Sequence, residues 1–324
     1  MITSLSYAFC LPLRTRPGAY RCRCGRCGGR QCRAERRAGA GPLPAPGAGA
    51  RWRAAPQHAL TGRAGFFTRD GTPPAKLLSL GRAELETYKS VEIKEAKVVG
   101  LVRCGKHFEL TLEAPTGHRS TRTARKVLLA TGVEDELPPL PGMRELWGSG
   151  VLHCPYCHGW EHRDQPLAVY GRAKLVTGLA LLVSRWSTDV VACVEDAANL
   201  TQNARRRLRR QGIAVREEPL ARLEGTANGE LRHLVFESGE PLARKALFIH
   251  AHQHQRSGLA EEMGCRLNAK GAVWVSKQQQ TTVPGLYAAG DNTPGTQQAL
   301  LAAAEGSAAA ISINETLTRE ECPR

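Results

Sequence analysis

The spacing of apolar positions along the chain predicts regular structure from about residue 76 onward. Residues 76–88 carry leucines and a tyrosine at helical spacing, which predicts an amphipathic helix. Strands are predicted by alternating or continuous apolar positions at 91–102, 107–113 and 126–130. The first half of the body therefore mixes helix and strand.

A second group of elements begins near Val151 and follows the order strand, helix, strand. These elements are predicted at 167–170, 175–186 and 189–194, with a basic helix at 200–211 after them. This order is typical of the β-α-β unit of a nucleotide-binding domain. Later segments are a polar connector at 250–257, a strand at 285–290 and a helix at 297–313.

Glycines and prolines mark the ends of these elements. The strand at 126–130 runs into Thr131 and Gly132, where we expect a sharp turn. Three prolines between residues 138 and 141 then break the chain and suggest a crossing between two domains.

The net charge of +15 belongs mostly to one segment. Residues 1–63 hold twelve Arg and one acidic residue, Glu35, and so contribute +11. The rest of the chain has an ordinary mixed surface, so we expect no nucleic-acid partner. No apolar run is long enough to cross a bilayer, and 8–13 is too short for a convincing signal peptide, so we expect a soluble cytoplasmic protein without membrane contact.

Cys154 and Cys157 are the only closely spaced cysteines of the body. Two intervening residues allow a small disulfide ring, and Pro155 stiffens the turn. A histidine beside the pair, here His158, can lower a thiol pKa and favour the nucleophilic thiolate. A zinc half-site and a purely structural pair are the alternatives, but the body offers no second ligand pair, so we expect no metal site.

A second candidate site is the turn from 171 to 176, between a strand and a helix. Gly171 allows close backbone approach to a pyrophosphate, whereas Ala173 and Val176 stand where a dinucleotide fingerprint has small residues. An ordinary β-α turn explains the segment equally well. Glu195, at the end of the next strand, favours binding of a ribose hydroxyl and NADH, while the basic helix favours a 2′-phosphate, so both donors stay open.

The strand at 285–290 ends in Gly290 and Asp291. A carboxylate there can reach a sugar-like hydroxyl, and the glycine permits close approach. The helix that opens at Gln298 and Ala299 would point its positive end at an electron-rich ring. The alternative is a buried strand followed by a turn aspartate.

Together these segments resemble the thioredoxin reductase-like branch of the pyridine nucleotide–disulfide oxidoreductases, in particular the branch whose redox motif continues into His-Gly. The resemblance covers about residues 65–315 and rests on four segments in the family's order. They are Phe66–Gly71, Leu128–Gly132, Cys154–Gly159 and Gly285–Asp291.

The resemblance implies an α/β fold of two Rossmann-like dinucleotide-binding domains, with an NAD(P) domain inserted into an FAD domain. The implied division is an aberrant or disordered segment at 1–64, FAD-domain parts at 65–150 and 256–324, and the NAD(P) domain with the cysteine pair at 151–255. The implied cofactors are FAD and NAD(P)H. The implied partner is a thioredoxin-like protein or a small disulfide or dithiol, with a homodimer as the assembly.

Residue roles follow from the same resemblance. Cys157 would be the flavin-proximal sulfur and Cys154 the thiol that exchanges with substrate. His158 stands where related reductases often have an aspartate, and it would serve as acid and base. Asp291 would hold the ribityl chain of FAD, with Gln298 and Ala299 beside the flavin's pyrimidine edge.

The first 63 residues depart from the family pattern, because they show neither a first strand nor a glycine-rich pyrophosphate turn. A nucleic-acid-binding arm and a zinc knuckle at Cys22, Cys24, Cys27 and Cys32 are two interpretations. We favour a third, a family N-terminus read in a shifted frame. Moved by one nucleotide, the codons of 21–26 can encode D-V-V-V-V-G, and those of 45–57 can encode a second strand with a terminal acidic residue.

Four functions therefore stay open. The first is reduction of a protein disulfide by NAD(P)H through Cys154 and Cys157. The second is oxidation of a dithiol on the same fold, with oxygen as acceptor. The third is a non-enzymatic basic, cysteine-rich binding protein, and the fourth is an inactive, FAD-deficient product of the damaged N-terminus.

Overall fold

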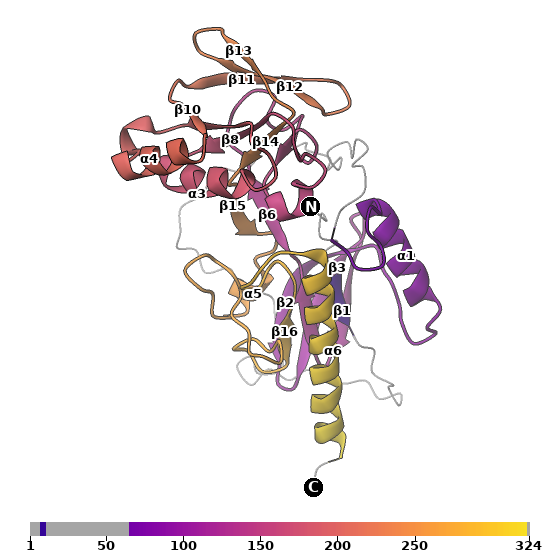
Figure 1. Cartoon of the computed structure of the whole chain (residues 1–324). Helices are drawn as coiled ribbons and strands as arrows, with labels where there is room; N and C mark the ends of the chain where they lie inside the picture. The colour runs from indigo at the N-terminus through magenta and orange to yellow at the C-terminus, as the bar shows by residue number, and fades with distance from the viewer. Residues whose placement is uncertain (1–6, 11–64, 323–324) are drawn as a thin grey trace.

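The computed structural model describes residues 7–10 and 65–322 and is an α/β fold (Figure 1). Its largest sheet has five parallel strands in the order β10-β9-β8-β14-β7. The strands are β7 (Val151–Leu152), β8 (Leu167–Gly171), β9 (Val190–Val194), β10 (Ala214–Arg216) and β14 (Ala246–Ile249). The helices α3 (Ala173–Val183) and α4 (Gln202–Arg210) join successive strands, which confirms the predicted β-α-β order.

The central strands of this sheet are buried on both faces. In β8, Leu167 and Val169 pack in the core cluster that includes α3, whereas Ala168 packs in the cluster on the other face. Because side chains alternate along a strand, a continuous apolar run such as β9 supplies both layers. The second layer is completed by an antiparallel sheet of β11 (Leu220–Gly225), β12 (Leu231–Phe236) and β13 (Pro241–Ala243).

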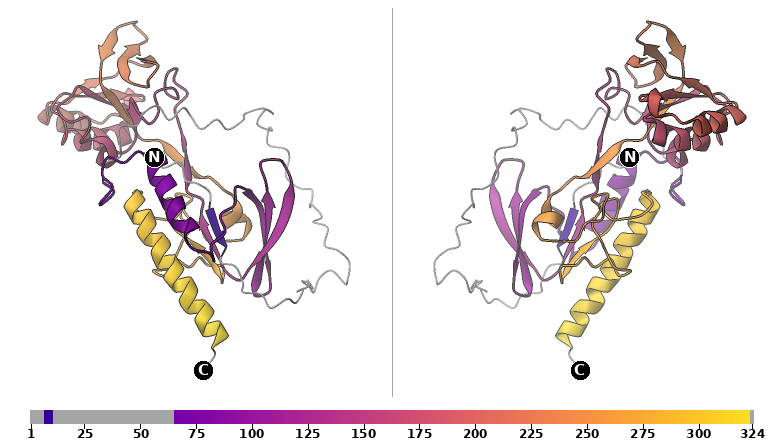
Figure 2. Two further views of the ribbon diagram at one scale, coloured as in Figure 1. Left: turned by 90° about the vertical axis from the view of Figure 1, so that its right-hand side faces the viewer. Right: turned by 90° about the vertical axis from the view of Figure 1, so that its left-hand side faces the viewer.

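A second layered unit holds the segments before and after this sheet (Figure 2). Strand β5 (Val127–Ala130) pairs in parallel with β16 (Leu286–Ala288). On one side, Leu129 packs in a cluster with the antiparallel strands β2 (Lys97–Cys104), β3 (His107–Glu113) and β4 (Arg119–Ala124). On the other side, Leu128 packs against α6 (Ala299–Glu321).

Two peripheral helices complete this unit: α1 (Pro74–Glu86), which confirms the predicted helix within two residues, and the short α5 (Leu259–Glu262). Within the described ranges, no helix combines the length and the apolar character that a membrane crossing requires.

The N-terminal prediction needs one correction. Sequence analysis expected no strand in residues 1–63, but Tyr7–Cys10 forms β1, which pairs antiparallel with β5. The open edge of β5 offers unpaired backbone groups, and a short segment can pair there without an alternating apolar pattern. The proposed frameshift segments and the four clustered cysteines lie at positions 11–64, outside the described residues.

The polar connector is also different from the prediction. It contains a strand, β15 (His252–Gln255), which pairs antiparallel with β6 (Val133–Glu136). Both segments lie where the chain passes between the two layered units, and Figure 1 shows the pair between them. The strand was not predicted because its side chains are polar and show no apolar alternation. Both faces of a two-stranded ribbon can be hydrated or hydrogen-bonded, so no apolar face is required.

Candidate active site

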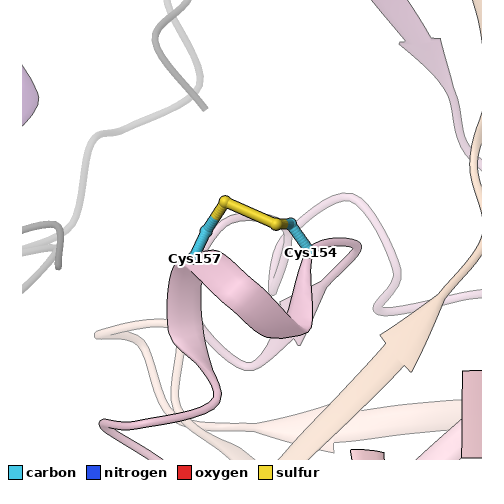
Figure 3. Close-up of a disulfide and its surroundings, with 2 residues drawn as sticks. All are labelled: Cys154 and Cys157. Carbon is cyan, nitrogen blue, oxygen red and sulfur yellow. A yellow bond between two sulfur atoms is a disulfide. The ribbon is translucent and has the colours of Figure 1, made fainter. Parts of the chain in front are cut away.

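The cysteine pair lies on a one-turn helix. Cys154 is the N-terminal flanking residue of α2 (Pro155–His158), and the backbone N–H of Cys157 donates to the carbonyl of Cys154 at 3.1 Å. The two Cα atoms are 5.3 Å apart and the sulfurs form a disulfide (Figure 3). Both cysteines are half-buried. The predicted pairing is thus formed by local backbone geometry.

Close packing beneath α2 explains why glycine follows the motif. A side chain at Gly159 would place its Cβ 2.6 Å from Cδ2 of Trp186 and 2.5 Å from the carbonyl oxygen of Pro155. No ordinary Cβ tolerates such contacts. Gly159 therefore lets the end of α2 pack on Trp186, and this contact holds the disulfide-bearing turn against its domain.

The surface around the disulfide is aromatic. Tyr156, between the two cysteines, is 64 % exposed and meets Trp186 edge to face, with ring centroids 5.6 Å apart. Trp160 is 63 % exposed, and the guanidinium of Arg163 lies 4.1 Å from its ring centroid. His158 ends α2 in a half-buried position directly after Cys157. These aromatic side chains therefore give the surface beside the disulfide a large apolar area.

The other cysteines of the described residues do not share this environment. Burial raises the pKa of the Cys193 thiol to about 12, and burial also raises the pKa of Cys265. Such thiols stay protonated and unreactive near neutral pH. Among the cysteines of the described residues, only Cys154 and Cys157 lie close to each other and are also partly exposed.

The predicted dinucleotide turn has the expected location but an unexpected neighbour. Gly171 ends β8, Ala173 begins α3, and Val176 is buried against the sheet. The backbone N–H of Ala173 donates to the Asp196 carboxylate, and Nε of Arg172 lies 3.7 Å from the same group. An acidic side chain therefore occupies the helix N-terminus, which is where a pyrophosphate would accept hydrogen bonds.

Glu195 was the predicted acidic residue at this strand end, whereas its neighbour Asp196 was not predicted. Glu195 is exposed, and its backbone N–H donates to the carbonyl of Gly171 at 3.0 Å. The hydrogen bond from Ala173, joined by weaker contributions from Asn199 and Arg172, lowers the pKa of Asp196. The sequence did contain a signal for Asp196: two acidic residues follow the buried strand β9, and either of them could face the turn after β8.

The flavin-side residues gather at the ends of β5 and β16. Gly290 has a φ of +87°, a conformation that favours glycine, and its backbone N–H donates to the carboxylate of Glu305 at 2.7 Å. The same carboxylate accepts from the Thr293 hydroxyl at 3.2 Å. Asp291 follows in a half-buried position. Glu305 was missed, although it is the only charged residue between 299 and 314.

Asn292 joins the two strand ends. Its side-chain nitrogen donates to the carbonyl of Leu129 at 3.1 Å and lies 3.4 Å from the hydroxyl of Thr131. Gly132, directly after Thr131, is buried with a φ of +64°. The structure thus brings the predicted Thr131–Gly132 turn beside the predicted Gly290–Asp291 turn.

These residues fit the flavin and ribityl part of FAD. The side-chain oxygen Oδ1 of Asn292 is buried and has no hydrogen-bond partner among the described residues, so a polar ligand would satisfy it. Gln298 flanks the start of α6, and no side chain in the described part of the chain caps that helix end. Its first N–H groups, beginning with Ala299, can therefore face an electron-rich group. The glycine-rich turn that holds the pyrophosphate in this family is the segment that the sequence lacks before residue 64, and positions 11–64 lie outside the described residues.

Comparisons with known proteins agree with this arrangement. The family model for pyridine nucleotide-disulphide oxidoreductases matches residues 45–306. A probable thioredoxin reductase of Arthroderma benhamiae is 27% identical over 285 residues, covering 79% of this chain and 70% of its own length. The thioredoxin reductase tcpT of Claviceps purpurea is 32% identical over 235 residues, covering 69% and 71%.

The fold comparison points the same way. The crystal structure of a putative thioredoxin reductase TrxB from Bacillus anthracis superposes with a TM-score of 0.75 at 32% identity, covering 82% of this chain and 88% of that one. A shared fold at this identity, together with a family match over most of the chain, establishes the kinship. The chain belongs to the pyridine nucleotide-disulphide oxidoreductases, a family of FAD-binding oxidoreductases that use NAD(P)H.

Proposed function

We propose that this chain reduces a disulfide of a thioredoxin-like protein or a small molecule, with Cys154 and Cys157 as the exchanging pair. The observation that carries the proposal is the disulfide on a half-buried turn flanked by the exposed rings of Tyr156 and Trp160. Such a surface admits a substrate sulfur to the pair, while the buried Cys193 thiol of the same unit stays inert.

The exchange itself needs only the two cysteines and a proton carrier. The Cys154 thiolate attacks one sulfur of the substrate disulfide, so that a mixed disulfide forms and the first substrate thiolate leaves. Cys157 then attacks Sγ of Cys154, re-forms the internal disulfide and releases the second substrate thiolate. The substrate gains two electrons and two protons, and the cysteine pair loses them. His158, next to Cys157, is the proposed proton carrier.

Bound FAD would supply the two electrons that return the disulfide to the dithiol, with NAD(P)H as the hydride source. Asp291 and Gly290 would hold the ribityl chain, and the start of α6 at Gln298 and Ala299 would face the flavin ring. Asn292 would orient the turn at Thr131. We also propose that the chain forms a homodimer, which light scattering of the purified chain tests.

One observation favours a second function, the oxidation of a dithiol. The Asp196 carboxylate lies at the N-terminus of α3, where it repels the pyrophosphate of a nicotinamide nucleotide. Without electrons from a nicotinamide nucleotide, the Cys154–Cys157 pair would accept two electrons from a substrate dithiol. Oxygen would be the final acceptor and become hydrogen peroxide. The residues and the bonds exchanged are the same, but electrons move in the opposite direction.

Turnover assays separate the two functions. A disulfide reductase oxidises NADH or NADPH only when thioredoxin or a small disulfide is present, and the Cys154→Ser variant does not. A dithiol oxidase consumes oxygen with a dithiol and without nucleotide. Absence of both activities in a chain that shows flavin absorption would refute both proposals. The inactive-product hypothesis predicts a colourless chain that binds flavin once residues 21–57 are replaced by the shifted-frame sequence. The binding-protein hypothesis predicts that the chain binds zinc or nucleic acid, and that Cys154→Ser and Cys157→Ser leave this binding unchanged.

A further inference from the structure

The ribbon of β6 and β15 carries a cluster of metal-binding side chains that the proposed function does not use. Glu136 on β6 lies opposite His252 on β15 in the strand register, and His254 lies two positions further along β15. Side chains two apart on a strand share a face, and cross-strand partners share it too. One face of the ribbon therefore presents two imidazoles and a carboxylate.

The donor atoms of these side chains are already close. Nε2 of His254 lies 2.8 Å from Oε2 of Glu136, and the rings of His252 and His254 meet edge to face with centroids 4.7 Å apart. One donor atom from each of the three residues falls within 4.8 Å of the others. All three side chains are exposed, so a hydrated ion can reach them without any opening of the fold.

The opposite face of the ribbon is engaged by the protein. Nε2 of Gln253 donates to the carboxylate of Asp135 at 2.9 Å, and Oε1 of Gln253 accepts from Gln297 at 2.8 Å. Nε2 of Gln255 donates to the carbonyls of Gly271 and Asn292, both at 3.0 Å. These bonds fix the ribbon's orientation and leave the histidine face turned outward. The cluster is thus built on a backbone that is held in place from behind.

We propose that Glu136, His252 and His254 bind one divalent transition-metal ion of the Zn²⁺ and Ni²⁺ class. Imidazole and carboxylate donors suit these ions. Zn–N and Zn–O bonds of about 2.0–2.2 Å put the ligand atoms of a tetrahedral site about 3.3–3.6 Å apart. The three donors lie close enough to reach that spacing by side-chain rotation alone. Water or Glu134, which lies opposite His254 on the same face, completes the coordination.

The ion would join the two strands on which the chain passes between its layered units. Glu136 and His254 are 118 residues apart in sequence, so the ion would cross-link distant segments. The sequence predicted no metal site because no second ligand pair lies near the cysteine pair at a suitable spacing. The strand register, and not any sequence motif, brings these three ligands together.

The test measures Zn²⁺ binding by calorimetry. The full chain is oxidised at Cys154–Cys157, and its other accessible thiols are alkylated. We expect one equivalent to bind. The double variant His252→Ala/His254→Ala should lose it. Glu136→Gln should weaken it by a factor of at least about 10, because loss of even an outer-shell partner costs about 10- to 100-fold. The matched control is His118→Ala, an exposed histidine before β4, which should bind as the parent chain does.

A second measurement keeps the test decisive if the double variant does not fold. In the unmutated chain, Zn²⁺ should protect His252 and His254 from diethyl pyrocarbonate, as detected by peptide mass spectrometry, while His118 stays reactive. The proposal is overturned if the alkylated chain binds no Zn²⁺, if the folded double variant binds it as tightly as the parent, or if Zn²⁺ leaves the modification of both histidines unchanged. None of these readouts depends on FAD or on the proposed redox activity.

Discussion

The carboxylate of Asp196 accepts a hydrogen bond from the backbone N–H of Ala173 at the first turn of α3. An anionic side chain thus holds the donor that a dinucleotide-binding turn offers to a pyrophosphate. We therefore propose that the choice between disulfide reduction and dithiol oxidation depends on how readily a nucleotide displaces this carboxylate.

Replacement of Asp196 by Asn should strengthen nucleotide binding. The substitution keeps the side-chain size and removes the negative charge from the helix N-terminus, so we expect the affinity for NADH to rise about two- to fivefold. Quenching of protein fluorescence by NADH measures the change. Glu195→Gln provides the comparison, because the neighbouring carboxylate is proposed to bind the ribose and its loss should weaken binding. Equal effects of both substitutions would contradict the assignment.

Replacement of Gly159 by Ala should destabilise the redox turn. The added Cβ would meet Trp186 and the Pro155 carbonyl at under 3 Å. We expect a loss of about 1–3 kcal/mol in the free energy of unfolding, because α2 must shift away from Trp186. Urea unfolding measures the loss. The matched control is Gly178→Ala in α3, where the new Cβ meets nothing within 4 Å and where alanine should stabilise the helix by about 0.5–1 kcal/mol.

Reduction of the protein should expose two additional reactive thiols. Titration with a chromogenic disulfide before and after reduction should differ by the sulfurs of Cys154 and Cys157. The buried thiol of Cys193 should react only after unfolding, because burial raises its pKa to about 12. The variant with both cysteines changed to Ser should show no increase on reduction. An unchanged increase in that variant would place the redox pair elsewhere in the chain.

Acid should weaken the attachment of α6. Burial acts to raise the pKa of Glu320, but hydrogen bonds from Lys126 and Arg125 outweigh it and leave the pKa below its usual value. As the pH falls, Glu320 is therefore protonated at a higher pH in the unfolded chain than in the folded chain. The stabilisation is complete above the usual glutamate pKa and is lost as the pH drops through the lowered, folded-state value.

Chemical denaturation as a function of pH tests this attachment. Glu320→Gln should lower stability at neutral pH and reduce the loss of stability in acid. Glu315→Gln, which affects an exposed pair with Arg319 on the same helix, should change little. Identical pH profiles for Glu320→Gln and the parent chain would show that the ion pair contributes nothing.

Much of the fold was predictable because its determinants are local. The apolar run of β9 and the leucines of α3 indicated a parallel sheet, since continuous apolar strands joined by helices bury both faces. The predicted strand at 107–113 coincides with β3. By contrast, β15 was mistaken for a connector, because its hydrogen-bonding partner β6 is remote in sequence and its polar side chains carry no apolar pattern.

The sequence by itself determined the chemistry of the cysteine pair and the family of the fold. Three-residue spacing on a helical turn brings two sulfurs together whatever surrounds them, and ordered glycine turns specify nucleotide-type strand ends. Only the tertiary structure decided which side chains meet from distant segments: Asp196 with Ala173, Trp186 with Gly159, and Glu136 with the two histidines of β15. Those contacts depend on strand register and on packing between layers. A shift of the strand register by one residue would separate these side chains, and no local sequence pattern indicates the register.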